Sequence, residues 1–148
     1  MLQLAFVVMS RPLLIRPTLR ATKHTLKICD SLYGKAHHKN GKANAFRHAL
    51  WNIEICQGSF GVTKNVGKSI YWAKKITDLH EKMAPNAKLE TAMDLHNNEI
   101  GRMLFMSIAD RNESNFVDYI QKKVENAQLL TKVEDIENYK NELVYISD

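Results

Sequence analysis

The sequence contains little cysteine, proline or glycine, and it has no long apolar run. Its 148 residues include two cysteines, three prolines and six glycines, which excludes a disulfide-stabilised scaffold, a collagen-like repeat and a disordered chain. Cys29 and Cys56 match no metal-ligand spacing, and we expect both to be reduced on helices of a cytoplasmic protein. No apolar stretch approaches the roughly 20 residues of a membrane-spanning helix. The length and the ordinary apolar content of 45% predict one globular domain.

The familiar local motifs of catalysis are absent as well. The sequence has no phosphate-binding loop, no glycine-rich dinucleotide fingerprint and no serine-hydrolase elbow. His80 and Glu81 are adjacent, but no second histidine follows at the spacing of a zinc-protease helix. Any active site must therefore be assembled from residues on different helices.

Charge is distributed unevenly along the chain. The net charge is +5, yet residues 1–47 carry nine Lys and Arg against the single acid Asp30, whereas residues 110–148 carry five against nine acids. A basic front half of this kind is typical of a face that binds phosphate on nucleic acid or on a lipid surface. An ordinary solvated surface, balanced by an acidic tail, is the alternative.

The first residues are apolar, and arginines follow them rather than precede them. Residues 2–9 contain no charge, whereas Arg11, Arg16 and Arg20 come next, which is the reverse of the order in a secretory signal peptide. We expect residues 2–20 either to lie on an anionic membrane surface or to form a short helix packed on the domain. Residues 1–17 therefore form a separate apolar and basic segment in this prediction.

The apolar periodicity is helical nearly throughout, and no run alternates long enough to predict a strand. We predict an all-α protein: a compact, single-domain bundle of five to six helices over residues 18–148, with its motifs concentrated in 40–110. The predicted helices cover residues 18–33, 43–57, 68–84, 87–108 and 116–130, and a last helix starts at Thr131 with Glu134 in capping-box spacing. Gly58 is expected to end the second helix and to open a flexible connection over 58–67.

Polar residues occupy an unusual side of the predicted 43–57 helix. One side forms an ordinary core stripe of Phe46, Ala49, Leu50 and Ile53. The opposite side carries Asn44, His48, Trp51, Asn52 and Ile55. Such a set suits neither solvent nor a plain apolar core. We therefore predict a helix with two buried walls, one in the core and one lining a cleft.

The predicted 87–108 helix contains residues that are costly inside a helix. Together, Asp94, Asn97, Asn98 and Gly101 cost about 2–3 kcal/mol relative to alanine. Asp94, Asn98 and Arg102 recur every four residues on one side, and His96 stands near the centre of an apolar stripe on the other. We expect Gly101 to permit close approach of another backbone or a ligand, and the asparagines to supply fixed hydrogen-bonding groups.

Histidines and acids on three helices are predicted to converge. His80 shares a side of its helix with Ala73, Ile76 and Thr77, which points it inward, with Glu81 at the edge of that face. A divalent metal ion would satisfy such buried groups together. The predicted catalytic and metal-binding residues are His48, His80, Glu81 and Asp94, with His96 as a further candidate ligand. The predicted substrate-binding residues are Asn44, Arg47, Asn52, Asn97, Asn98 and Arg102.

Simpler roles stay open for several of these residues. Without a metal, His48 or His80 would act as a general base oriented by Glu81 or Asp94. His96 also suits a hydrogen-bonded histidine in the core. Salt bridges would equally account for Asp94 with Arg102, and for Glu81 with Lys74 or Lys82. His37 and His38 lie in a basic loop and are expected to be solvated.

Three runs together resemble a known family: NGKANAFRHALWN at 40–52, ITDLHEKMAPN at 76–86 and AMDLHNNEIGR at 92–102. They are similar to an uncharacterised bacterial domain family of Bacteroidetes-type genomes, over roughly residues 18–110. The resemblance implies a site but no reaction, and it places these residues in the family's signature: Asn44, Arg47, His48, Trp51, Asn52, His80, Glu81, Asp94, Asn97, Asn98, Gly101 and Arg102. A weaker likeness is to HD-type metal-dependent phosphohydrolases, although Glu81 stands where that family has Asp, and Asp94 comes early.

Two functions follow from these observations. The first is a metal-dependent hydrolase that acts on a phosphate-containing substrate, either a phosphoester or a phospholipid, through the His/Glu/Asp cluster. Arg47 and Arg102 would bind the anionic part of that substrate. The second is a non-catalytic helical module, without metal, whose basic face binds nucleic acid or a protein partner.

Overall fold

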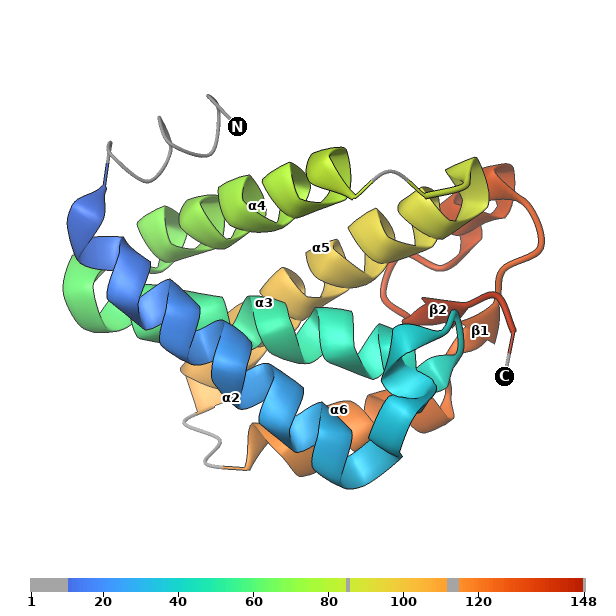
Figure 1. Ribbon diagram of the computed structural model, residues 1–148, viewed down its shortest axis with the longest axis horizontal. Coiled ribbons are helices and arrows are strands. Elements are labelled where there is room, and N and C mark those ends of the chain that lie inside the picture. The colour runs from blue at the N-terminus through green and yellow to red at the C-terminus, as the bar shows by residue number, and fades with distance from the viewer. Residues whose placement is uncertain (1–10, 85, 112–114, 148) are drawn as a thin grey trace.

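The protein is a helical bundle, described here by a computed structural model that covers residues 11–84, 86–111 and 115–147 (Figure 1). Its α-helices are α2 (Ile15–Tyr33), α3 (Lys42–Thr63), α4 (Val66–Met83), α5 (Lys88–Arg111) and α6 (Phe116–Glu125). Short 3-10 helices are η1 (Pro12–Leu14), η2 (Gly34–His38) and η3 (Val133–Asn138), and two-residue strands are β1 (Gln128–Leu129) and β2 (Val144–Tyr145). The all-α prediction is confirmed. The predicted segment 2–9 lies outside the described residues.

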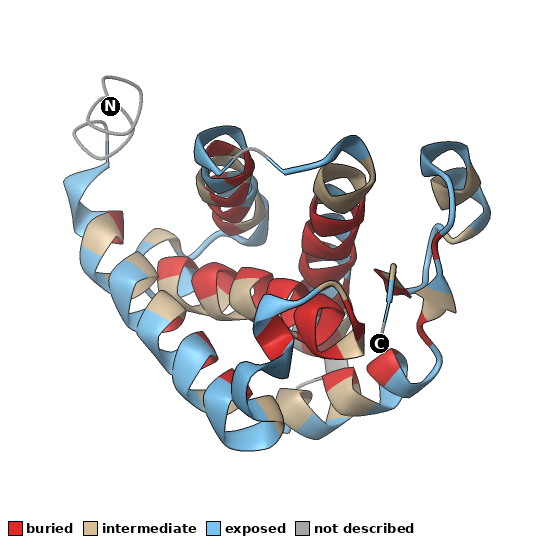
Figure 2. Cartoon of the chain, turned by 45° about the vertical axis from the view of Figure 1, so that its right-hand side comes forward, coloured by how far each residue is buried: buried red, intermediate tan, exposed pale blue. Residues whose placement is uncertain are grey.

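Helix α3 lies at the centre of the bundle and packs against α2, α4, α5 and α6 (Figure 1). Its predicted core stripe is confirmed, since Phe46, Leu50 and Ile53 are completely buried. The opposite side is buried as well, as Figure 2 shows by the red ribbon around most of this helix. Burial of apolar surface on α3 from several directions supplies the main stabilisation of the fold, at roughly 25 cal/mol per Å².

Helices α3 and α5 touch backbone to backbone at Gly101. A Cβ atom on this glycine would lie 2.6 Å from the carbonyl oxygen of Ala49 and 2.8 Å from its Cα. Neither approach is sterically allowed, so only glycine permits this crossing. The expectation that Gly101 admits a second backbone is confirmed, and the crossing brings the polar sides of α3 and α5 against each other.

Several predicted helix ends are wrong. Helix α3 continues through Gly58 to Thr63, because Gly58 is a packing position: a Cβ there would lie 3.3 Å from the Cβ of Pro17. The flexible connection predicted over 58–67 shrinks to two residues, of which Lys64 adopts the left-handed conformation with φ of 52°. Helix α2 starts at Ile15 rather than at residue 18.

The acidic end of the chain is less helical than predicted. Helix α6 ends at Glu125, and β1 then pairs in parallel with β2. No capping box forms at Thr131, because η3 begins only at Val133 after Lys132, and the Thr131 hydroxyl donates to Asp135 instead, at 3.4 Å. The spacing of Thr131 and Glu134 was therefore not sufficient to predict where η3 begins.

Both cysteines are free and lie on helices, as predicted, with Cys29 on α2 and Cys56 on α3, and both are buried. Burial raises the pKa of each thiol, Cys29 and Cys56, to about 12, which makes both unreactive. Among the described residues, none of the helices combines the length and the apolar content that crossing a bilayer requires.

Candidate functional site

Two polar stripes face each other where α3 and α5 cross. The α3 stripe consists of Asn44, His48 and Asn52, and the α5 stripe of Asp94, Asn98 and Arg102. Residues four apart lie on one side of a helix, so each stripe presents its three side chains in the same direction. Helix α4 adds Thr77 and Glu81, also four residues apart. All eight side chains are buried.

The amide end of this layer is formed by Asn52, Thr77, Asn98 and Arg102, and none of their buried side-chain polar atoms lacks a hydrogen-bond partner. Arg102 donates to the Asn52 side-chain oxygen at 3.0 Å and to Thr77 Oγ1 at 3.3 Å. Asn52 Nδ2 donates to the His48 carbonyl at 2.9 Å and to Asn98 Oδ1 at 2.7 Å. Because buried polar groups without partners are costly, this pairing makes the amide end a stabilising part of the fold.

These contacts fix the tautomer of His48. The His48 carbonyl only accepts hydrogen bonds, so the Asn52 atom that faces it is a nitrogen, and the Asn98 atom bonded to that nitrogen is an oxygen. This same Asn98 oxygen lies 3.0 Å from His48 Nδ1. Nδ1 therefore carries the proton, and Nε2 of the neutral ring presents a lone pair.

At the acid end, formed by His48, Glu81 and Asp94, one contact joins two acceptors. His48 Nε2 lies 3.2 Å from Asp94 Oδ1, which is buried and without a hydrogen bond among the described residues. Arg47 Nη2 donates a hydrogen bond to Nε2 at 3.0 Å, so the lone pair of Nε2 has a partner, whereas Asp94 Oδ1 has none. A lone pair and a carboxylate oxygen attract each other only when a proton or a cation lies between them. The acid end therefore contains one unpaired carboxylate oxygen beside an imidazole nitrogen.

The pKa values at the acid end are displaced in opposite directions. Burial, followed by the positive charge of Arg47, lowers the pKa of His48 to about 3. Burial, followed by the negative charge of Glu81, raises the pKa of Asp94 to about 7. Burial also raises the pKa of Glu81. Near neutral pH the acid end therefore holds a neutral imidazole and two carboxyl groups that compete for protons.

The acid end fits a divalent metal ion. His48, Glu81 and Asp94 each offer a ligand atom, and these three atoms lie within 4.8 Å of one another. One imidazole nitrogen and two carboxylates form a mixed N/O set suited to zinc, manganese, iron or nickel. Arg47 Nη2 donates a hydrogen bond to Nε2 at 3.0 Å, so an ion bound at Nε2 must displace the Arg47 guanidinium.

A second group of potential ligands, Asp30, His37 and His38, fits a metal less well. His37 Nε2 lies 3.1 Å from Asp30 Oδ1, whereas His37 Nδ1 is buried without a hydrogen-bond partner among the described residues. A metal on Nε2 would force the proton onto Nδ1, where nothing accepts it. The expectation that His37 is solvated is wrong, because its side chain is fully buried against α3, whereas His38 is exposed as predicted.

A cavity of about 650 Å³ between α4 and α5 reaches the acid end. Glu81 and Arg102 form part of its wall, and so does Asn86, whose side-chain nitrogen lies 3.5 Å from Asp94 Oδ2. The prediction that the polar side of α3 lines a cleft is wrong: none of the lining residues comes from α3, and its polar side is covered by α4 and α5. Glu81 and Asn86 therefore connect the cavity with the buried group.

Helical phase explains why His80 is not part of the acid end. Glu81 is four residues from Thr77 and shares its inward direction, whereas His80 is exposed and lies edge-on to the Trp51 ring, with the ring centroids 5.1 Å apart. The expectation that His80 points inward is wrong by one position along α4. His80 contacts the Trp51 ring and is not one of the three residues that offer ligand atoms at the acid end.

Two further predicted site residues hold the C-terminal segment instead. Asn97 donates to the Val144 carbonyl at 2.8 Å and accepts from the Val144 amide at 2.9 Å, so its side chain pairs with β2 as a strand would. His96 Nε2 lies 2.8 Å from the Glu142 carbonyl, which confirms the alternative of a hydrogen-bonded histidine. Neither side chain belongs to the acid end, and the candidate metal role of His96 is not supported.

The remaining predicted residues lie around the acid end. Asn44 is buried one turn before His48, and its side-chain oxygen has no hydrogen-bond partner among the described residues. The salt bridge considered for Asp94 and Arg102 does not form, since Arg102 bonds the amide end. Lys74 pairs with Asp78 at 2.6 Å rather than with Glu81. Sequence reasoning did not assign Thr77 and Asn86 to the site; the spacing of Thr77 from Glu81 was the available signal.

The chain belongs to the family described as Domain of unknown function (DUF6973), which it matches over residues 5–128. No curated protein and no solved structure matches it. The predicted resemblance to a family without an assigned activity is therefore confirmed, and the match extends beyond residues 18–110 on both sides. Because the description of the family assigns no activity to it, the function has to be inferred from the chemistry of the site.

Proposed function

We propose that this protein is a metal-dependent hydrolase that acts on a phosphate-containing substrate at the acid end. The observation that supports this most is Asp94 Oδ1, a buried carboxylate oxygen that lies 3.2 Å from His48 Nε2 and has no hydrogen-bond partner among the described residues. A metal ion that displaces Arg47 from Nε2 would give this oxygen a partner, and Glu81 completes the set of three ligands. Groups with displaced pKa values beside a cavity are typical of functional sites.

Each residue then has a definite task. His48, Glu81 and Asp94 would hold the ion, which when bound acts as a Lewis acid and lowers the pKa of a water molecule. Asn98 and Asn52 keep the proton on His48 Nδ1 and so leave Nε2 as an acceptor, which is a positioning role. Arg47, once displaced from Nε2 by the ion, would supply a positive charge for an anionic substrate.

The charge balance of the cavity favours an anionic substrate only with the ion in place. Its wall has three basic side chains, Lys74, Lys82 and Arg102, and three acidic ones, Asp78, Glu81 and Glu99. A dication on Glu81 and the nearby charge of Arg47 shift this balance to positive. A phosphoester or the headgroup of a phospholipid matches that charge. Metal-free catalysis by His48 is disfavoured because a base with a pKa of about 3 is too weak near neutral pH.

The test is metal binding by the full chain and by two variants, His48→Ala and Asp94→Ala. After removal of bound metal, titration with zinc or manganese should show one tight site. Each variant should lose affinity by about 100-fold or more, beyond the loss typical for outer partners of a ligand. Hydrolysis of a chromogenic phosphodiester and of phospholipid vesicles should fall in parallel and should identify the substrate class.

The matched control is His96→Gln, which removes an imidazole close in sequence to Asp94 but outside the acid end. It should keep metal affinity; because His96 also lines the cavity, this variant is a control for metal binding and not for hydrolysis. A second control, His38→Gln, separates binding at the group formed by Asp30, His37 and His38. Unchanged metal affinity and unchanged hydrolysis in both acid-end variants would contradict the proposal and favour the non-catalytic binding module.

A further inference from the structure

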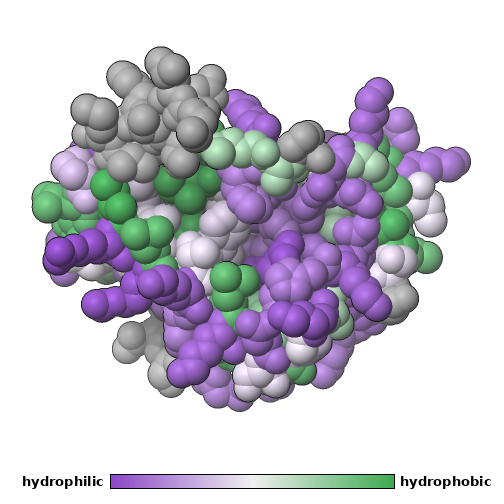
Figure 3. Space-filling model, in the orientation of Figure 1, coloured by the Kyte–Doolittle hydropathy of each residue, from purple (hydrophilic) through white to green (hydrophobic). Residues whose placement is uncertain are grey.

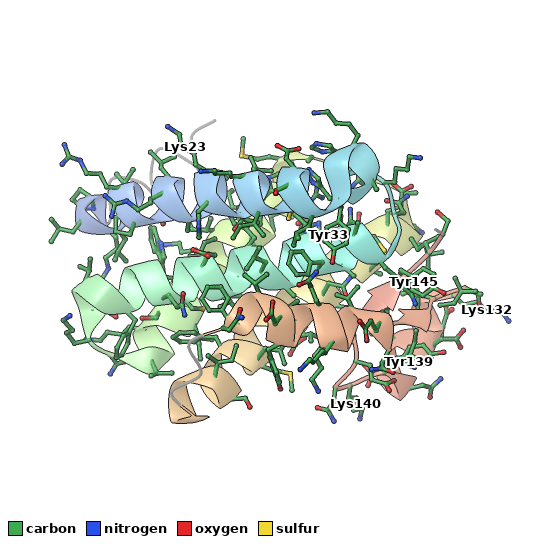
Figure 4. The ribbon with its side chains drawn as sticks, turned by 90° about the horizontal axis from the view of Figure 1, so that it is seen from below. Lys23, Tyr33, Lys132, Tyr139, Lys140 and Tyr145 are labelled. Carbon is green, nitrogen blue, oxygen red and sulfur yellow. The ribbon has the colours of Figure 1, made fainter. Side chains whose placement is uncertain are left out.

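The outer side of α2 carries a row of positive charges. Arg16, Arg20, Lys23 and Lys27 are exposed and stand at positions i, i+4, i+7 and i+11, which places them on one side of the helix; we call them the basic stripe. At 1.5 Å per residue the stripe is about 16 Å long. Figure 4 shows the Lys23 side chain pointing away from the rest of the bundle.

No acid on the same stretch of chain neutralises this stripe. Residues 11–29 contain five Lys and Arg and no Asp or Glu. Glu54 of α3 lines a pocket together with Arg16 and Arg20, and its carboxylate lies 2.8 Å from His24. This single acid balances only part of the four positive charges of the stripe. The basic stripe therefore produces a positive potential over this face.

Apolar side chains lie next to the basic stripe and face solvent. Leu13 is 75% exposed, Leu19 57% and Leu26 38%. Leu19 and Leu26 are seven residues apart, so they form a second row along the helix beside the charges. In Figure 3 strongly hydrophilic side chains alternate with hydrophobic ones over the part of this face where α2 runs in Figure 1. Leu19 and Leu26 on α2, with Leu13 just before them on η1, therefore add exposed apolar side chains to the face that carries the basic stripe.

From this combination we infer that the outer face of α2 binds the surface of an anionic lipid bilayer. Lys and Arg near such a surface each contribute about 1 kcal/mol, and apolar side chains gain further by entering the headgroup region. Nucleic acid would use the basic stripe but would leave the three leucines exposed. The inference is independent of the proposed hydrolase activity, because no residue of the acid end takes part.

The experiment is cosedimentation of the full chain with vesicles of equal parts phosphatidylglycerol and phosphatidylcholine. Binding should be tight at low salt, weaker at high salt, and absent with pure phosphatidylcholine. The variant R20Q/K27Q should bind about 30-fold more weakly. The variant L19S/L26S should bind about 10-fold more weakly with an unchanged salt dependence, since it removes only the apolar contribution. All four positions are exposed, so both variants should keep the circular dichroism spectrum of the native chain.

The control variant K122Q/K132Q changes the net charge by the same amount on α6 and before η3, where both lysines are exposed. It should bind vesicles as the native chain does. Equal losses in this control and in R20Q/K27Q would overturn the inference, since net charge alone would then explain binding. Unchanged vesicle binding of L19S/L26S would also overturn the inference, since the leucines would then make no contact with the bilayer. Tighter binding of single-stranded RNA than of vesicles at equal charge concentration and salt would favour a nucleic-acid surface instead.

Discussion

The two ends of the polar layer between α3, α4 and α5 are both buried but differ in how their polar atoms are paired. At the amide end no buried polar side-chain atom of Arg102 or Asn52 lacks a hydrogen-bond partner. At the acid end Arg47 donates to His48 Nε2, but Asp94 Oδ1, 3.2 Å from Nε2, has no partner among the described residues. Burial is nearly the same, so environment alone does not separate them. The two ends are distinguished by whether every buried polar atom has a hydrogen-bond partner. This difference indicates a structural role for the amide end and a chemical role for the acid end.

The largest expected effect comes from disrupting both ends together. Gly101→Ala places a Cβ 2.6 Å from the Ala49 carbonyl oxygen, so α3 and α5 must separate. We expect a loss of roughly 3 kcal/mol in the free energy of unfolding, at the upper end for overpacking. Urea unfolding at equilibrium measures it. Gly61→Ala is the control, because a Cβ there meets nothing within 4 Å, and it should stabilise α3 by about 0.5–1 kcal/mol. Equal effects at both glycines would contradict the close crossing.

An intermediate effect is expected from breaking the amide end alone. Asn52→Ala removes the acceptor of Arg102 and the donor to Asn98, and it leaves both partners buried without it. The protein should lose about 2–3 kcal/mol of stability. His48 also loses its positioning, so metal affinity should fall by about 10-fold, much less than on removal of a ligand. A loss of affinity as large as that of His48→Ala would mean that the two ends do not differ as described.

The smallest effect, and one of opposite sign, is expected at the acid end. Asp94→Asn should stabilise the metal-free protein by about 2 kcal/mol near neutral pH, because the amide carries no charge to bury and can donate to His48 Nε2. The folded-state pKa of Asp94, about 7, lies above its ordinary value of 3.8. Between these values the folded native protein binds more protons than the unfolded chain, so it loses stability as the pH rises.

The asparagine variant does not lose stability in this way as the pH rises. The gain in its free energy of unfolding over that of the native chain should therefore be absent near about pH 4 and largest above about pH 7. His48 contributes an opposite slope, since its pKa of about 3 lies below the ordinary 6.5, but the native chain and the variant share that contribution. Unfolding curves in chelator over this range measure the difference. A variant that is less stable than the native chain at every pH would show that Asp94 is satisfied in the native structure.

Much of this arrangement could be predicted from the sequence, because it depends on helical phase. The repeat of Asp94, Asn98 and Arg102 every four residues, and the costly Gly101, indicated a polar side of α5 in close contact with another helix. The same reasoning failed by one residue on α4, where the apolar neighbours of His80 pointed it inward although Glu81 is the inward residue. Neighbouring residues point about 100° apart around the helix axis, and a short amphipathic pattern does not distinguish between two such directions.

The roles of Asn97 and His96 could not be predicted, because their partners are backbone atoms. Val144 and Glu142 lie more than forty residues further along the chain, as the hydrogen bonds show. A backbone carbonyl carries no residue-specific signal in a sequence. Adjacent asparagines on α5 consequently look alike, yet Asn97 fastens β2 whereas Asn98 orients His48.

The contact between Gly101 and Ala49 has a consequence for redesign. Main-chain atoms alone fix the spacing of the two helices at this crossing, so the spacing does not depend on which functional groups the polar layer carries. Substitutions at positions 48, 81 and 94 should therefore leave this crossing unchanged. Different sets of candidate metal ligands can be compared at these positions one residue at a time, on the same backbone.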